Sequence, residues 1–233
     1  MGDLFSLKNK TALVTGASMG IGQAISIGLA NAGARVICAD CAPLDDTLDQ
    51  IRQAGGSARE LELDLRESVL AARIASEVMP VDILVNSAGI NCRNAAVVFS
   101  EKDWDGVLDV DLKSSFFLCR EFAKSAFDAG RTGKIINIAS IVAYQGGPRG
   151  VSYTVAKSGV VGMTRSLANE WGAKGILVNA IAPGFVETNM TRTLVEDPKL
   201  HKEIAARIPL GRWGKPEDMV GAAIFLASRH RIM

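Results

Sequence analysis

Residues 13–22 read LVTGASMGIG, an apolar run that passes through three glycines into a longer segment, 20–33, of helical period. The apolar, β-branched start is typical of a buried strand, so the stretch predicts a strand, a tight turn and a helix. Gly16, Gly20 and Gly22 permit tight backbone angles and let a phosphate approach the main chain. The helix offers that anion unpaired amides and the positive end of its dipole. We therefore expect a dinucleotide-binding turn, with a tight turn that holds no ligand as the alternative.

The rest of the chain repeats this alternation of strand and helix. Apolar runs recur at 11–16, 34–40, 83–89, 134–140 and 176–184, and longer segments of helical period, such as 103–127, separate them. Uninterrupted apolar strands separated by helices are typical of a parallel sheet covered on both faces. The sequence contains no repeat and no proline-rich linker, so we expect residues 1–233 to form one doubly wound, Rossmann-like α/β domain.

Composition favours a small-molecule partner over a polymer or a membrane. The net charge is +1 and 22% of residues are charged, which gives no electrostatic reason to bind nucleic acid or an anionic bilayer. No apolar run is long enough to span a membrane, and the N-terminus lacks the apolar core of a signal peptide. Four cysteines without a secretion signal favour the cytoplasm.

Cysteines 38 and 41 form a C-x-x-C pattern that raises the question of a metal site. A zinc site needs a second pair of ligands, and the two histidines of the chain, His201 and His230, are isolated from it. We therefore expect no metal.

Asp40 closes the second apolar run, about twenty residues beyond the glycine turn. A carboxylate at this place accepts hydrogen bonds from the adenosine ribose hydroxyls of NAD and repels the 2′-phosphate of NADP. The alternative is that Asp40 only caps the turn that follows.

Further motifs occur in a fixed order along nearly the whole chain. The pattern T-G-x-x-x-G-x-G at residues 15–22 is followed by NSAG at 86–89, INIAS ending at Ser140, YTVAK at 153–157 and APGFVET at 182–188. This series resembles the short-chain dehydrogenase/reductase family. The resemblance implies the strand order 3-2-1-4-5-6 and a homotetramer.

The resemblance also implies a set of cofactor-binding residues. NADP-dependent relatives carry a cation where Met19 or Cys41 stands in this chain, so we favour NAD. The residues expected to hold it are Gly16, Ser18, Met19, Gly20, Ile21, Gly22, Asp40, Asp64, Leu65, Asn86, Ala88, Gly89, Tyr153, Lys157, Pro183, Gly184, Val186 and Thr188.

Tyr153 and Lys157 are four residues apart, so on a helix they project from one face and can address one pocket. A lysine ammonium beside a tyrosine favours the phenolate form, which is the better base. The resemblance implies that Tyr153 removes a hydroxyl proton while hydride passes to the nicotinamide. It further implies that Ser140 hydrogen-bonds the reacting oxygen and that Lys157 also holds the nicotinamide ribose.

Residues 110–112 read VDL where the family usually has V-N-L. In the family, the backbone carbonyl of that asparagine positions a water linked to the lysine, so Asp111 can retain this catalytic function. An extra carboxylate near Lys157 would raise the pKa of the lysine. We expect a modest effect on activity.

Substrate-side phrases, FSEKDWD at 99–105, YQGG at 144–147 and RIPLGRWG at 207–214, resemble the branch of the family that acts on sugar acids such as 2-dehydro-3-deoxy-D-gluconate. The polar segment 188–214 looks like the mobile flap that closes over substrate in the family. Arg93 and Arg149 are candidates to bind a carboxylate, with solvated surface arginines as the alternative, and Gln145 and Asn189 are candidates to bind sugar hydroxyls.

Three further functions stay open at this point. One is a 3-oxoacyl-(acyl-carrier-protein) reductase that uses NADPH, and another is a polyol dehydrogenase. A non-catalytic NAD-binding protein is the possibility of a different class. Family members continue after FLAS through a last strand that helps to build the tetramer, whereas the chain stops at FLASRHRIM. We therefore expect the last strand to be missing and the homo-oligomer to be weakened.

Overall fold

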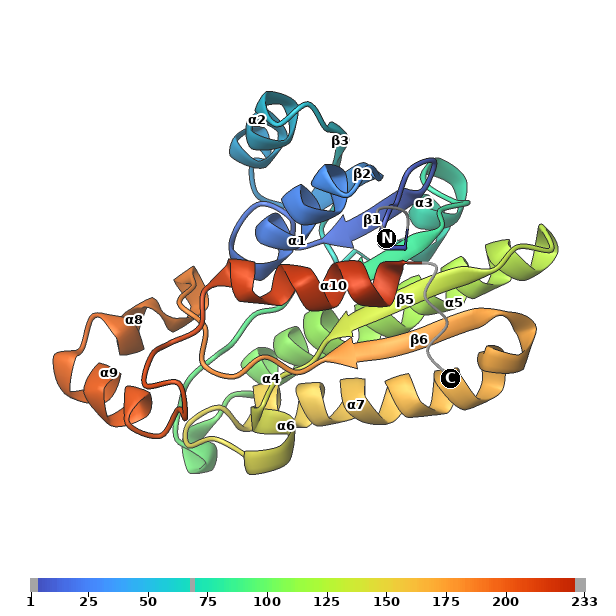
Figure 1. Cartoon of the computed structure of the whole chain (residues 1–233). Helices are drawn as coiled ribbons and strands as arrows, with labels where there is room; N and C mark the ends of the chain where they lie inside the picture. The colour runs from blue at the N-terminus through green and yellow to red at the C-terminus, as the bar shows by residue number, and fades with distance from the viewer. Residues whose placement is uncertain (1–3, 68–69, 229–233) are drawn as a thin grey trace.

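Six strands, all within the described residues, form one parallel sheet in the order β3-β2-β1-β4-β5-β6 (Figure 1). The computed structural model describes residues 4–67 and 70–228. The strands are β1 (Thr11–Thr15), β2 (Arg35–Asp40), β3 (Ser57–Glu62), β4 (Ile83–Asn86), β5 (Gly133–Ile138) and β6 (Ile176–Ile181). The predicted fold class and strand order are confirmed. The predicted loss of a last strand concerns the end of the chain, where residues 229–233 lie outside the described part.

The central strands are apolar because both faces of the sheet are covered. Residues 12–15 of β1 and all four residues of β4 are buried. β1 pairs with β2 and with β4, and Thr15 lies beside Ala39 on one side and Asn86 on the other. The chain therefore leaves β1, β2 and β4 at one common edge of the sheet, their carboxyl ends.

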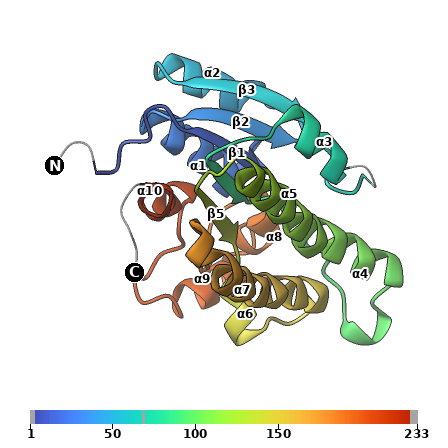
Figure 2. The same cartoon turned by 90° about the vertical axis from the view of Figure 1, so that its right-hand side faces the viewer.

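Helices cover both faces of the sheet, as the two separate apolar clusters and Figure 2 show. Helices α3 (Leu70–Glu77), α5 (Ser114–Asp128) and α7 (Val151–Trp171) pack on one face. Helices α1 (Gly20–Asn31), α2 (Asp45–Gln53) and α10 (Val220–Ala227) pack on the other. The remaining helical segments are α4 (Glu101–Leu108), α6 (Val142–Gln145), α8 (Arg192–Val195), α9 (Pro198–Ala205), η1 (Ala96–Val98), η2 (Asp109–Lys113), η3 (Gly172–Lys174), η4 (Asn189–Thr191) and η5 (Pro216–Met219).

The predicted helix at 103–127 is three consecutive segments. α4 passes into one wide π-helical turn, η2, and then into α5. A π-turn within an α-helix is frequent at functional sites. This turn places Asp111 in the protein interior, where Asp111 is 1% exposed.

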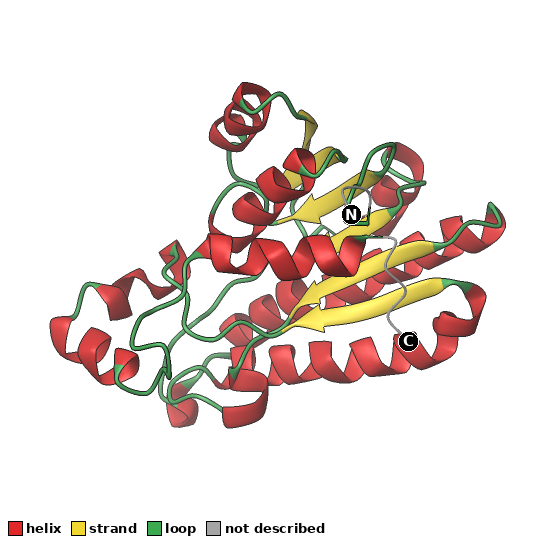
Figure 3. Cartoon of the chain, viewed as in Figure 1, coloured by secondary structure: helices red, strands yellow, loops and turns green. Residues whose placement is uncertain are grey.

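The flap, residues 188–214, leaves the sheet after β6 and contains η4, α8 and α9. Its longest helix, α9, begins where Asp197 accepts hydrogen bonds from the amides of Lys199 and Leu200 and where Pro198 takes the first helical position. In Figure 3 the strand arrows point toward the loops that lead to α8 and α9. The flap therefore stands beyond the carboxyl ends of the strands.

No helix among residues 4–67 and 70–228 is both long and apolar enough to cross a bilayer.

Candidate active site

A cleft of about 1350 Å³ lies beyond the carboxyl ends of the strands, between the sheet edge and the flap. Crevices at this edge are where open α/β sheets bind their ligands. Most of the residues predicted for cofactor, catalysis or substrate line it: Gly16, Ser18, Met19, Gly20, Ile21, Gly22, Asp40, Asp64, Leu65, Arg93, Ala88, Gly89, Ser140, Gln145, Tyr153, Lys157, Pro183, Gly184, Val186, Thr188 and Asn189.

The glycine turn is built so tightly that side chains would not fit. Gly16 has a φ of +69°, and a Cβ added there would lie 2.7 Å from the backbone of Ala88. A Cβ on Gly22 would lie 2.0 Å from the carbonyl oxygen of Gly16. The chain can therefore fold back against the loop after β4 only because both residues are glycine.

Helix α1 presents open amides to the cleft. Its N-cap residue, Met19, makes no side-chain hydrogen bond to the first turn. The first amides of a helix have no partner within the helix, and an anion satisfies them together with the helix dipole. The glycine turn and this helix end fit the pyrophosphate of a dinucleotide.

Asp40 closes β2 and is fixed by two backbone amides. The Ser18 amide donates to Oδ2 at 3.0 Å, and the Ala42 amide donates to Oδ1 at 3.1 Å. The second bond is the turn cap that was the alternative for this residue. The first bond joins the carboxylate to the glycine turn, so Asp40 lines the cleft and also caps the turn that follows β2.

Arg66 is a cleft residue that the sequence motifs did not reveal. Its guanidinium binds the carboxylate of Asp64 with contacts of 2.7 to 3.2 Å, and this hydrogen bonding holds the pKa of Asp64 below its ordinary value. The arginine places one positive charge at the end of the cleft that holds Asp40 and Cys41. No charge or spacing pattern in the sequence marks it.

Tyr153 and Lys157 lie on α7, one turn apart, and Ser140 follows the end of β5. The Lys157 Nζ donates a hydrogen bond to the carbonyl of Ile138 at 3.1 Å and lies 5.4 Å from the centroid of the Tyr153 ring. Ser140 is buried, and its Oγ accepts from the Val142 amide at 3.3 Å. The lysine thus fastens α7 to the strand end that carries the serine, and all three side chains reach one cleft.

Asp111 lies beneath the cleft, as an ion-pair partner of Lys157. The Lys157 Nζ is 3.3 Å from Asp111 Oδ2, and the two side chains are 4% and 0% exposed. Asp111 Oδ1 accepts from the Ile90 amide at 2.7 Å. A Cβ on Gly89 would lie 2.8 Å from Asp111 Oδ2, so the pair packs directly under that glycine.

Burial and pairing act in opposite directions on these two groups. Burial alone would lower the pKa of Lys157, but the charges of Asp111 and Tyr153 raise it above its ordinary value. Burial raises the pKa of Asp111, and the Lys157 charge and the Ile90 amide only partly offset that rise. This direction for Lys157 is the one expected of an extra carboxylate, and its effect on activity stays a prediction.

Three predicted residues do not line the cleft: Asp111, Asn86 and Arg149. Asn86 is buried, and its amide donates to Asn137 Oδ1 at 2.8 Å; the Asn137 amide in turn donates to Thr164 at 2.9 Å. These bonds join β4, β5 and α7 below the cleft floor. Arg149 is exposed, at a φ of +63°.

The flap reaches the glycine turn at one end of the cleft. The Asn189 amide donates a weak hydrogen bond to Met19 Sδ at 3.0 Å. Flap residues that the sequence analysis did not name as candidates also line the cleft, namely Met190, Thr191, Leu194, Leu200, Glu203, Ile204 and Arg207.

The cysteines form no disulfide, with Cys38 and Cys119 buried and Cys41 exposed. Burial raises the pKa of Cys38 to about 11 and that of Cys119 to about 12, so both stay protonated thiols at neutral pH. Across the described residues, no group of three acidic, histidine or cysteine side chains could hold a metal ion.

The chain matches a known family and several known proteins. A family model described as "Enoyl-(Acyl carrier protein) reductase" matches residues 16–232. The 2-dehydro-3-deoxy-D-gluconate 5-dehydrogenase of Escherichia coli is 46% identical over 228 residues, which cover 96% of this chain and 90% of the relative.

Two crystal structures share its fold closely. One, from Agrobacterium tumefaciens, is of a candidate 2-deoxy-D-gluconate 3-dehydrogenase with bound NADP; it is 54% identical with a TM-score of 0.93, and the match covers 96% of this chain and 91% of that chain. The other, from Beutenbergia cavernae, is of a candidate NAD(P)-dependent gluconate 5-dehydrogenase with NADP at low occupancy; it is 45% identical with a TM-score of 0.92, and coverage is again 96% and 91%.

Proposed function

Because this chain belongs to the short-chain dehydrogenase/reductase family, we propose that it interconverts a secondary hydroxyl and a ketone on a sugar acid such as 2-dehydro-3-deoxy-D-gluconate. One observation carries the proposal. The side chains of Ser140, Tyr153 and Lys157 face the same cleft as a glycine turn in which no side chain would fit. The proposed proton-transfer group and the proposed phosphate-binding turn thus line one cavity.

The side chains would divide the work as follows. Tyr153 takes the hydroxyl proton in the oxidation direction and returns it to the ketone oxygen in reduction. Lys157, held by the Ile138 carbonyl, supplies the positive charge that favours the phenolate. Ser140 donates a hydrogen bond to the reacting oxygen and fixes its position. When bound, the nicotinamide dinucleotide accepts or supplies the hydride.

Cofactor choice is proposed to favour NAD, because the Asp40 carboxylate faces the adenosine end of the cleft. Arg66 and the NADP held by the two structural relatives support the opposite choice. In this chain the Arg66 charge is already matched by Asp64, which leaves Asp40 as the unmatched charge beside the glycine turn. Measured Kd values for NADH and NADPH decide between the two.

A 3-oxoacyl reductase is the second candidate, favoured by the 38% identity over 231 residues with the 3-oxoacyl-(acyl-carrier-protein) reductase of Rickettsia prowazekii. A polyol dehydrogenase and a non-catalytic NAD-binding protein are less well supported, because no residue of the cleft favours either over a sugar-acid enzyme. The decisive experiment is a substrate panel of keto-sugar acids, polyols and 3-oxoacyl thioesters, each assayed with both reduced cofactors. We expect turnover with the keto-sugar acid and NADH.

The variant Tyr153→Phe tests the proposed chemistry. We expect its kcat to fall by about 10²- to 10⁴-fold, the usual contribution of a general acid or base, while it still binds cofactor. Turnover at the wild-type rate would show that Tyr153 is not the proton-transfer group. Cofactor binding without turnover of any panel member in the wild type would favour a non-catalytic NAD-binding protein.

We also propose that the protein works in the cytoplasm as a homo-oligomer. The free thiols support a reducing compartment. Exposed apolar side chains on two neighbouring helices, Phe116 on α5 and Val155 on α7, support self-association. Light scattering of the purified chain measures its oligomeric state.

A further inference from the structure

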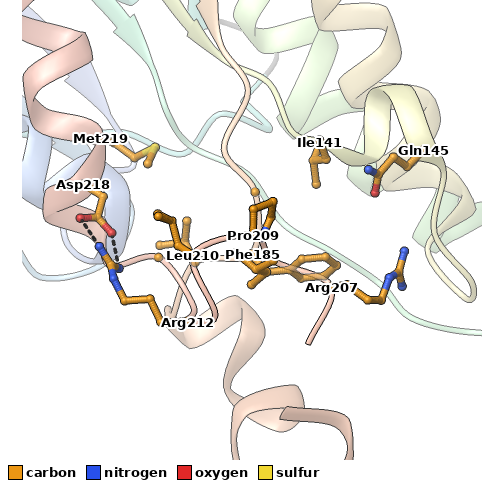
Figure 4. Close-up of a pocket in the computed structure, with 13 residues that line it drawn as sticks. Ile141, Gln145, Phe185, Arg207, Pro209, Leu210, Arg212, Asp218 and Met219 are labelled. Carbon is orange, nitrogen blue, oxygen red and sulfur yellow. Dashed lines mark hydrogen bonds and ion pairs between the residues drawn. The ribbon is translucent and has the colours of Figure 1, made fainter. Parts of the chain in front are cut away.

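A second hollow of about 420 Å³ adjoins the substrate end of the cleft (Figure 4). Six residues line both cavities: Ile141, Gln145, Gly184, Phe185, Val186 and Arg207. Ile141 directly follows Ser140, so the hollow opens beside the serine expected to hold the reacting oxygen. A substrate whose hydroxyl lies at Ser140 would therefore extend its far end toward this hollow.

Two arginines line the hollow, and their charges differ in availability. Arg212 donates to both carboxylate oxygens of Asp218, at 2.8 and 3.2 Å, and to the Trp213 carbonyl. Arg207 has no ion pair and no side-chain hydrogen bond within the part of the chain that the structure describes. In Figure 4 its guanidinium and the Gln145 amide lie on the same side of the hollow, away from the Arg212–Asp218 pair.

The other cations near the cleft are less suited to an anion at this end. Lys157 is already paired with Asp111. Arg93 lines the cleft but not the second hollow, and Arg149 lines neither. One acidic side chain, Glu203, also lines the cleft from the flap, and among the described residues no ion pair joins it to Arg207.

We propose that Arg207 binds the carboxylate of the sugar-acid substrate, with Gln145 as a second hydrogen-bond donor in the hollow. This inference rests on the proposed function. It assigns recognition of the substrate's carboxylate to a residue of the flap. A guanidinium offers parallel N–H donors that match a carboxylate in a bidentate pair. Because Arg207 lies just beyond the end of α9, binding the carboxylate would draw the flap over the substrate.

The test measures substrate affinity without turnover. Tyr153→Phe, loaded with NAD, is titrated calorimetrically with 2-dehydro-3-deoxy-D-gluconate, and the titration is repeated after adding Arg207→Met or Arg207→Lys. A hydrogen bond to a charged group contributes about 1.5–3 kcal/mol, so Arg207→Met should weaken binding by about 10- to 150-fold. Arg207→Lys should weaken binding less than Arg207→Met, because the lysine ammonium keeps the positive charge but cannot form the bidentate pair of a guanidinium.

Matched variants separate a specific contact from a general loss of charge. Lys202 lies on α9, is exposed and lines neither cavity, so Lys202→Met removes the same charge from the flap and should leave the affinity within about twofold. The affinity for NAD should stay unchanged in every flap variant. Equal losses for Arg207→Met and Lys202→Met, or a loss for Arg93→Met alone, would overturn the proposal.

The outcome stays separable from that of the proposed function. If the wild type turns over the sugar acid while Arg207→Met binds it normally, only the role of Arg207 fails. If the wild type shows no turnover but Arg207→Met still abolishes binding of the acid, the carboxylate site stands and the proposed reaction fails. Absence of any binding to the NAD complex refutes both.

Discussion

Replacing Asp111 by asparagine removes one charge from a buried ion pair under the proposed proton-transfer group. The two charges are 3.3 Å apart and nearly fully buried. At an effective dielectric constant of about 20 their attraction is about 5 kcal/mol, which corresponds to a ceiling of about 3 to 4 pH units. Burial raises the pKa of Asp111, so we expect the effect of its carboxylate to stay below this ceiling.

We therefore expect the pH profile of kcat/KM for sugar-acid oxidation to move to lower pH by about 1 to 2 units in Asp111→Asn. The reason is that the Asp111 charge raises the pKa of Lys157, so its loss should let Lys157 release its proton at lower pH. Asparagine keeps an acceptor for the Ile90 amide, so we expect the fold and a kcat within about tenfold at the new optimum.

The assay is a pH series of initial rates at saturating cofactor, with Kd for NADH and the melting temperature measured alongside. Asp109→Asn is the matched control, because Asp109 lies in the same π-turn but forms an exposed ion pair with Lys113 at 2.9 Å. Its profile should not move. An Asp111→Asn profile that coincides with the wild type, with cofactor binding intact, would refute the reasoning, as would a large rise in kcat.

Three further predictions concern the glycine turn, helix α7 and the amino end of the sheet. Gly22→Ala should weaken NADH binding by at least about tenfold, because its Cβ would lie 2.0 Å from the Gly16 oxygen; unchanged affinity by fluorescence titration would contradict this. Gly162→Ala, within α7 and with no atom within 4 Å of the new Cβ, should raise the free energy of unfolding by about 0.5–1 kcal/mol in urea, and a decrease would contradict it. Burial opposes ionisation of Asp82, but the Thr11 amide, Lys10 and Arg131 bring its pKa below the ordinary 3.8. The ionised carboxylate therefore stabilises the fold above about pH 3.8, and this stabilisation is lost as the pH falls through the lowered native pKa. Asp82→Asn should lower the free energy of unfolding by about 1–3 kcal/mol at pH 7 and by less in acid. A difference from the wild type that persists in acid would contradict this.

The sequence pattern predicted the structural features that depend on residues close together in the chain. The central strands are apolar on both faces, and the glycine turn and the Tyr153–Lys157 spacing are encoded within a few residues. β3 carries no apolar run of its own, because it is an edge strand with one buried residue, Leu61. Its place was implied only by the family resemblance.

The charges at the two ends of the cleft depended on tertiary contacts. In the sequence nothing distinguishes Arg66 or Arg207 from other charged residues. In the folded chain Arg66 forms an ion pair with Asp64, whereas no ion pair within the described residues involves Arg207. Arg149, a candidate by position in the sequence, lies outside both cavities. The π-turn that buries Asp111 likewise follows from packing rather than from helical periodicity.

The contact between Asn189 and Met19 has a kinetic consequence. The same flap that would grip the acid also rests on the turn that would receive the pyrophosphate, so a substrate bound first would shut the route by which the dinucleotide enters. We therefore expect a compulsory order of addition, in which the dinucleotide binds first and leaves last.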